Sequence, residues 1–229
     1  MFRLNFSALR KAGLALLLLA TGAQAQVKDG GWAGFQRITT ASGSSLWVPQ
    51  DTMVGPRPLM ILLPMTRGTA ADVVRNWYAE SLPAKARERG LMVLLPSTPG
   101  SRANYAGAGA WDATLKRYVG QLDAEVADAV AHHGADPARV VLAGFSMGGD
   151  LAWALPQRNP ERYSGAIIMG SRASLRDEAA LKRLTERGMR MFFFMGDSEA
   201  ATRRSGSREA RDILKQLGIP NGDLMIGFR

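Results

Sequence analysis

The pattern Gly144-Phe145-Ser146-Met147-Gly148 constrains the fold of this chain more than any other feature of its sequence. The apolar run 140–143 before it is typical of a buried strand, and the segment 151–155 after it is a good helix opening. A serine between a strand and a helix is held at the end of a sheet, where its hydroxyl can act as a nucleophile. Glycines on both sides allow the backbone to turn tightly beneath it. The segment therefore predicts a nucleophile elbow at Ser146; the alternative is an ordinary strand-to-helix turn.

The first 25 residues have the pattern of a secretory signal peptide. Three basic residues precede an apolar stretch at 13–20, and Ala23-Gln24-Ala25 is a small-x-small cleavage site. The apolar stretch is too short to span a membrane. We therefore expect a signal peptide at 1–25 and a periplasmic or secreted product without stable membrane insertion after cleavage. The alternative is an uncleaved N-terminal anchor.

The remaining residues, 26–229, are expected to form one domain, because a chain of this size with 46% hydrophobic residues can bury a substantial core. The formal net charge of +9 includes Arg3, Arg10 and Lys11, so removing these three leaves +6. The other basic residues are dispersed, which argues against a nucleic-acid partner. The chain has no cysteine, which excludes disulfides and thiolate chemistry. It also has no phosphate-binding loop, dinucleotide fingerprint or metal-ligand cluster, so we expect no cofactor and no metal.

Apolar runs alternate with amphipathic segments over most of the chain. Two short segments, 34–38 and 45–49, are expected to form an antiparallel hairpin. Alternating strands and helices predict a mainly parallel central sheet flanked by helices. The expected strands are 59–63, 91–95, 140–143, 166–169, 189–195 and 224–228, and the expected helices are 72–82, 111–133, 175–187 and 207–217, with a further helix opening at 151.

The elbow, followed by Asn159-Pro160-Glu161-Arg162-Tyr163-Ser164-Gly165-Ala166, resembles the α/β-hydrolase superfamily. Within the superfamily, the chain is most similar to small carboxylesterase/phospholipase and depolymerase-like serine esterases. The resemblance runs from about Leu59 to the C-terminus. It implies an α/β-hydrolase fold and acyl-enzyme chemistry at Ser146 on a small-molecule or polymeric ester.

The resemblance also implies how the site is completed. One oxyanion amide would be that of Met147, and the second that of Thr66, with Met65 as the alternative. The acid would lie after the strand 189–195. The spacing in the family favours Glu199, while Asp197 is the more usual residue type.

Four aromatic residues could contribute to substrate binding. Tyr105 lies in the Pro/Gly/Ser-rich loop 96–110 and Trp111 directly follows it, so both are candidates for the mouth of the site. Trp77 and Trp153 have helical spacing and are expected in the core.

The catalytic base is absent from the sequence. The only histidines, His132 and His133, precede the elbow strand, whose five or six residues would place them about 17–20 Å from Ser146. They are expected to stabilise the end of a helix. Two explanations remain open. Either the sequence ends at Arg229 before a C-terminal His loop, or the chain is a natural His-less, non-catalytic binding protein. In both cases we expect the chain as given to be inactive or nearly so.

Overall fold

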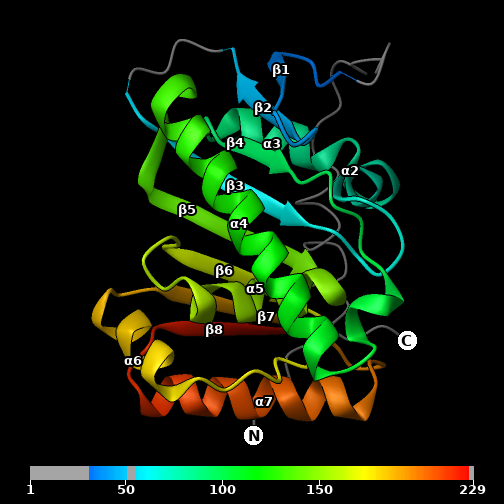
Figure 1. Cartoon of the computed structure of the whole chain (residues 1–229), viewed down its shortest axis with the longest axis vertical. Helices are drawn as coiled ribbons and strands as arrows, with labels where there is room; N and C mark the ends of the chain where they lie inside the picture. Colours follow the sequence, from blue (N-terminus) through cyan, green and yellow to red (C-terminus); the bar gives the residue numbers. More distant parts are fainter. Residues whose placement is uncertain (1–30, 51–54, 227–229) are drawn as a thin grey trace, which may run out of the picture.

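The structure is a computed structural model and describes residues 31–50 and 55–226 (Figure 1). Over these residues the chain forms an eight-stranded sheet in the order β1-β2-β4-β3-β5-β6-β7-β8. β1 pairs antiparallel with β2, and β2 antiparallel with β4, whereas the other neighbours are parallel. The strands are β1 (Phe35–Thr39), β2 (Ser45–Pro49), β3 (Arg57–Leu63), β4 (Met92–Leu95), β5 (Ala135–Phe145), β6 (Gly165–Met169), β7 (Arg190–Gly196) and β8 (Asn221–Ile226).

Helices cover both faces of this sheet (Figure 1). They are α2 (Ala70–Val73), the π-helix η1 (Val74–Tyr78), α3 (Ser81–Glu88), the 3-10 helix η2 (Arg102–Tyr105), α4 (Ala108–His133), α5 (Met147–Arg158), α6 (Glu178–Glu186) and α7 (Ala201–Gln216). The predicted mainly parallel sheet flanked by helices is therefore confirmed, and so is the antiparallel hairpin at its start.

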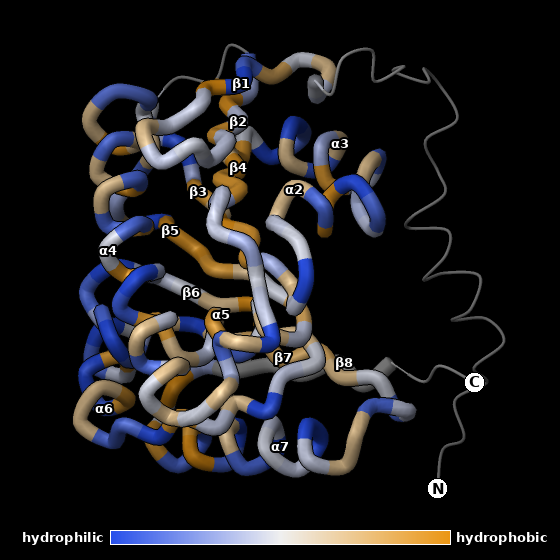
Figure 2. Tube along the Cα trace, turned by 45° about the vertical axis from the view of Figure 1, so that its right-hand side comes forward, coloured by the Kyte–Doolittle hydropathy of each residue, from blue (hydrophilic) through white to orange (hydrophobic). Residues whose placement is uncertain are grey.

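The core consists of two apolar clusters, one on each face of the sheet. Alternate residues of β3 point to opposite faces, so Ile61 packs in the cluster with α4 to α7 and Leu62 in the cluster with α2 and α3. Hydrophobic residues are concentrated on the central strands, whereas the helices outside them carry many hydrophilic residues (Figure 2). This pattern explains why continuous apolar runs predicted the parallel strands.

Two helical predictions need correction. The segment 72–82 is not one helix, because it is divided into α2, η1 and the start of α3. Pro83 does not end a helix but lies in the first turn of α3, where its missing N–H needs no acceptor. α7 begins at Ala201 rather than at 207, which brings Arg203 into its first turn.

The predicted signal peptide and the chain's last three residues lie outside the described residues. Of the helices that the structure describes, none is long and apolar enough to cross a membrane.

Candidate active site

Ser146 lies at the turn between β5 and α5, with φ 56° and ψ −116°. A positive φ is unfavourable for a residue with a Cβ, so the neighbouring structure must hold this conformation. The Ser146 amide donates to the carbonyl of Met169 at 2.9 Å, and its carbonyl accepts from the amide of Asp150 at 3.0 Å. Ser146 remains partly exposed and is not enclosed by packed side chains.

The glycines of the elbow are required by close backbone contacts. A Cβ on Gly144 would lie 2.3 Å from the carbonyl carbon of Gly148, and one on Gly148 would lie 2.8 Å from the carbonyl oxygen of Leu63. No real Cβ fits at these distances. The start of α5 is thereby seated against the end of β3.

The two predicted oxyanion amides come from these touching segments. Met147 is the first residue of α5, so its amide has no intrahelical acceptor. Thr66 lies in the loop after β3, which is fastened to a neighbouring loop. The amide of Arg67 donates to the carbonyl of Gly100 at 3.0 Å. The amide of Gly100 in turn donates to the carbonyl of Gly68 at 2.8 Å. A helix N-terminus beside a fixed loop is a suitable arrangement for stabilising an oxyanion.

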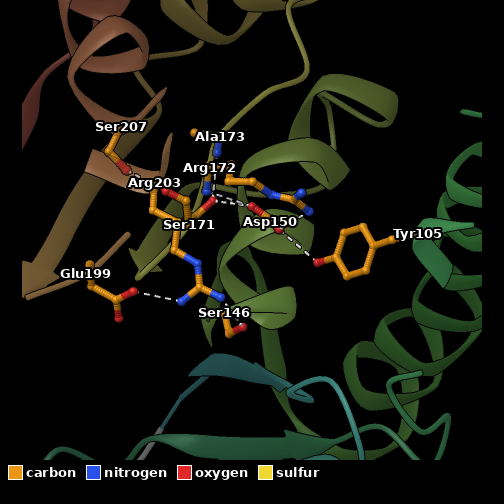
Figure 3. Close-up of polar contacts among 9 residues, drawn as sticks. All are labelled: Tyr105, Ser146, Asp150, Ser171, Arg172, Ala173, Glu199, Arg203 and Ser207. Carbon is orange, nitrogen blue, oxygen red and sulfur yellow. Dashed lines mark hydrogen bonds and ion pairs between the residues drawn. The ribbon is translucent and has the colours of Figure 1, made fainter. Parts of the chain in front are cut away.

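One of the two candidate acids is connected to the serine through an arginine. The Glu199 carboxylate accepts from Arg203 Nη1 at 2.8 Å, and Arg203 Nη2 donates to Ser146 Oγ at 3.2 Å (Figure 3). Asp197 is exposed, and its carbonyl accepts from Arg204 Nη1 at 2.6 Å. Of the two carboxylates, the structure therefore links Glu199 to Ser146.

Sequence reasoning did not identify Arg203 as a site residue. The pair Arg203-Arg204 reads as a solvated face, and α7 was expected to begin after it. The available signal was spacing, because Arg203 follows Glu199 by four residues, a separation at which an acid and a base often form a pair.

The histidines lie at the opposite end of β5 from Ser146. They form the last turn of α4, where His132 Nδ1 is 2.9 Å from Asp128 Oδ1 and His133 Nε2 is 3.4 Å from Asp128 Oδ2. β5 begins two residues after His133 and leads directly to Ser146. Neither imidazole can therefore act on this serine.

Asp150 is a second site residue that sequence reasoning missed. Only 7% of it is exposed, and its carboxylate accepts from Tyr105 Oη at 2.8 Å and from Ser171 Oγ at 2.7 Å. It also accepts from the Arg172 amide at 2.9 Å and from Arg172 Nη2 at 3.3 Å. This network joins the first turn of α5 to η2 and to the loop after β6 (Figure 3).

Of the two predicted mouth residues, Tyr105 is held by this network and Trp111 stacks on Tyr105. Their rings stack at 5.0 Å, and the Arg172 guanidinium lies 4.7 Å from the centre of the Tyr105 ring. Burial, and then the adjacent Asp150 charge, raise the pKa of Tyr105 far above its ordinary value. Tyr105 is therefore a neutral hydrogen-bond donor, and the stacked pair forms a fixed wall beside the first turn of α5.

Trp77 and Trp153, the two tryptophans expected in the core, differ in their exposure. Trp153 is fully buried, as expected, and its Nε1 donates to the Leu175 carbonyl at 2.8 Å. The expectation that Trp77 is a core residue is wrong, because 62% of it is exposed. Its position in η1 explains the difference, since a π-helix does not follow the 3.6-residue period. The ring of Trp77 lies 6.1 Å from that of Phe145, the residue before Ser146.

Comparisons with known proteins add to this geometry at the level of the fold. No family model and no curated protein match the sequence. A thermostable esterase is similar in structure, with a TM-score of 0.66 and 17% identity over 86% of this chain and 55% of its own. The feruloyl esterase module of Clostridium thermocellum has a TM-score of 0.60 and 11% identity over 85% of this chain and 80% of its own. An S-formylglutathione hydrolase of Staphylococcus aureus has a TM-score of 0.58 and 14% identity over 84% and 86%.

The chain has the α/β-hydrolase fold. The fold implied by the resemblance is thus confirmed, and identities this low show nothing beyond the fold. The chain spans little more than half the length of the thermostable esterase. In this α/β-hydrolase fold, the place between the serine and the carboxylate is taken by a guanidinium, because Arg203 contacts both Ser146 and Glu199.

Proposed function

We propose that this chain is an exported serine hydrolase that acts on small-molecule or polymeric carboxylic esters through an acyl-enzyme at Ser146. The observation that carries the proposal is the backbone of Ser146, held at φ 56° between β5 and α5 with its hydroxyl directed at the Glu199–Arg203 pair. The esterases among the similar structures support the same class of reaction.

The proposed reaction has two steps. Ser146 Oγ attacks the acyl carbon and the alcohol leaves, which gives an ester of Ser146. Water then releases the acid. The amides of Met147 and Thr66 would stabilise the negative oxygen that develops in both steps. The proton of Ser146 Oγ must pass to a base, and Glu199 would orient that base.

Arg203 cannot be this base, because a guanidinium stays protonated in proteins and has no acceptor atom. We therefore expect the chain as given to turn over esters very slowly. The oxyanion amides and substrate binding alone leave about a 10³–10⁴-fold acceleration over the reaction in water.

Imidazole rescue tests the proposal directly. The variant Arg203→Ala vacates the place between Ser146 and Glu199, and added imidazole can then supply the missing base. Labelling by a fluorophosphonate probe should increase with imidazole concentration in Arg203→Ala. It should remain in Arg203→Ala/Ser205→Ala, where the second change removes an exposed hydroxyl of α7. Labelling that survives in Arg203→Ala/Ser146→Ala, or that does not respond to imidazole, would exclude Ser146 as the nucleophile.

A non-catalytic binding protein is the second candidate. Arg203 favours this alternative, because its guanidinium donates to the oxygen that would have to act as the nucleophile. In addition, neither of the two histidines in the sequence lies near Ser146. Absence of imidazole rescue would support this alternative. Export can be tested separately, since N-terminal sequencing of protein from the cell envelope or medium should begin at Gln26.

A further inference from the structure

We propose that Arg203, beside Ser146, makes this site a receptor for a carboxylate group, the anion that ester hydrolysis would release. The inference deepens the proposed function by naming the ligand chemistry of the same site. The binding itself requires only Arg203 and the space beside Ser146, so it can be tested without turnover.

The donors of Arg203 are only partly used within the protein. A guanidinium has five N–H donors in a planar fork. One donates to Glu199 through Nη1 and one to Ser146 through Nη2, which leaves three without an acceptor among the described residues. About a third of the side chain is exposed, so a ligand can reach these donors. The fork of arginine matches the two oxygens of a carboxylate, and such charge-assisted pairs are among the stronger hydrogen bonds.

The guanidinium is held in place before any ligand binds. Arg204 Nη1 donates to the carbonyls of Asp197 at 2.6 Å and Glu199 at 2.9 Å, which ties α7 to the loop that carries the acid. α7 is also seated on the loop after β6, because a Cβ on Gly206 would lie only 2.0 Å from the Arg172 carbonyl oxygen. Binding therefore costs little additional ordering of Arg203.

The charges around Arg203 set the expected affinity. Glu199 is the acidic partner of Arg203 among the described residues, and it competes with an incoming carboxylate. Asp150, the other acidic group of the site, is already paired with Arg172. The first turn of α5 begins beside Ser146 and adds a partial positive charge. Removing the charge of Glu199 should therefore strengthen carboxylate binding, whereas removing that of Arg203 should weaken it.

Calorimetric titration with benzoate tests the inference, with neutral benzamide as the matched ligand. Benzoate should bind the wild-type protein more tightly than benzamide does. Arg203→Met should weaken benzoate binding about tenfold or more, the loss expected for a charge-assisted hydrogen bond. Glu199→Gln should strengthen it. Arg208→Met, which removes an exposed arginine from the same helix, should leave it unchanged and so controls for net charge.

Two further variants complete the test. Ser146→Ala should keep benzoate binding, because the guanidinium remains, although it abolishes probe labelling. Arg203→Lys, which keeps the charge and loses the fork, should bind benzoate with intermediate affinity and serves if Arg203→Met unfolds. Equal affinity for benzoate and benzamide, or benzoate binding that does not depend on residue 203, would overturn the inference. Absence of imidazole-dependent probe labelling in Arg203→Ala, together with benzoate binding by the wild-type protein, would instead count against the hydrolase alone.

Discussion

Individual residues around Ser146 depend on contacts between distant parts of the chain. Asp150 illustrates this, because its donors come from η2 and from the loop after β6. The local pattern of the sequence predicted the elbow, and the resemblance to the α/β-hydrolase superfamily implied both candidate acids. The sequence could not predict which side chains meet Asp150 or that Arg203 contacts Ser146, since those contacts depend on how the strands are ordered. Glu125 is another example, because a glutamate on a long helix is usually exposed, yet this one is buried and accepts from Thr40 and Ser42.

Replacing Asp150 should show how much this network contributes to stability. Asp150→Ala leaves four donors without their acceptor, and we expect a loss of about 2–4 kcal/mol in the free energy of unfolding. Urea denaturation measures the change. Asp212→Ala, which removes an exposed carboxylate from α7, is the control and should change stability by less than about 0.5 kcal/mol. Similar values for the two variants would show that the network does not stabilise the fold.

Asp72 should make stability depend on pH. Hydrogen bonds from the Thr69 backbone and hydroxyl, and then the Arg75 charge, hold the pKa of Asp72 below its ordinary value of 3.8. A carboxyl with a lowered pKa stabilises the folded state above its unfolded pKa, and this contribution is lost as pH falls through the folded pKa. The stability difference between wild type and Asp72→Asn should therefore be larger at pH 6 than below pH 3, as urea titrations at both values can measure. A difference independent of pH would contradict this assignment.

At the scale of elements, α7 carries Arg203 into the site and is seated on the loop after β6 by the close contact of Gly206 with the Arg172 carbonyl. The sequence predicted its amphipathic second half but not its first turns, where small and basic residues give little hydrophobic periodicity. The same limit applies to 72–82, where the change to a π-helix leaves no clear signal in the sequence. The strands were more predictable, because burial on both faces requires continuous apolar runs.

Two glycine substitutions separate helix propensity from packing. In α4, Gly120 has no atom near the position of a Cβ, so Gly120→Ala should stabilise the fold by about 0.5–1 kcal/mol. In α7, Gly206→Ala would place a Cβ against the Arg172 carbonyl and should destabilise the fold by about 1–3 kcal/mol. Thermal unfolding of the two variants should shift in opposite directions. A stabilised Gly206→Ala would show that α7 is not seated as described.

At the scale of the whole molecule, the order of the strands brings the site together. Ser146 follows β5, Glu199 follows β7 and Thr66 follows β3, and the carboxyl ends of parallel strands meet at one edge of the sheet. The same topology places His132 and His133 at the other edge. Alternation of strands and helices was enough to predict a mainly parallel sheet, since parallel strands need helical crossovers, but it did not predict the order of the strands. That the Arg203 guanidinium lies between Ser146 and Glu199 could be found only from the structure.

The central claim is that Ser146 forms an ester with the acyl group of a substrate. Mass spectrometry after incubation of Arg203→Ala with p-nitrophenyl acetate and imidazole tests it most directly. Trypsin releases Ser146 in the peptide 140–158, and we predict an acetyl group on Ser146 of this peptide. An unmodified peptide 140–158, or an acetyl group found only on other residues, would contradict the claim.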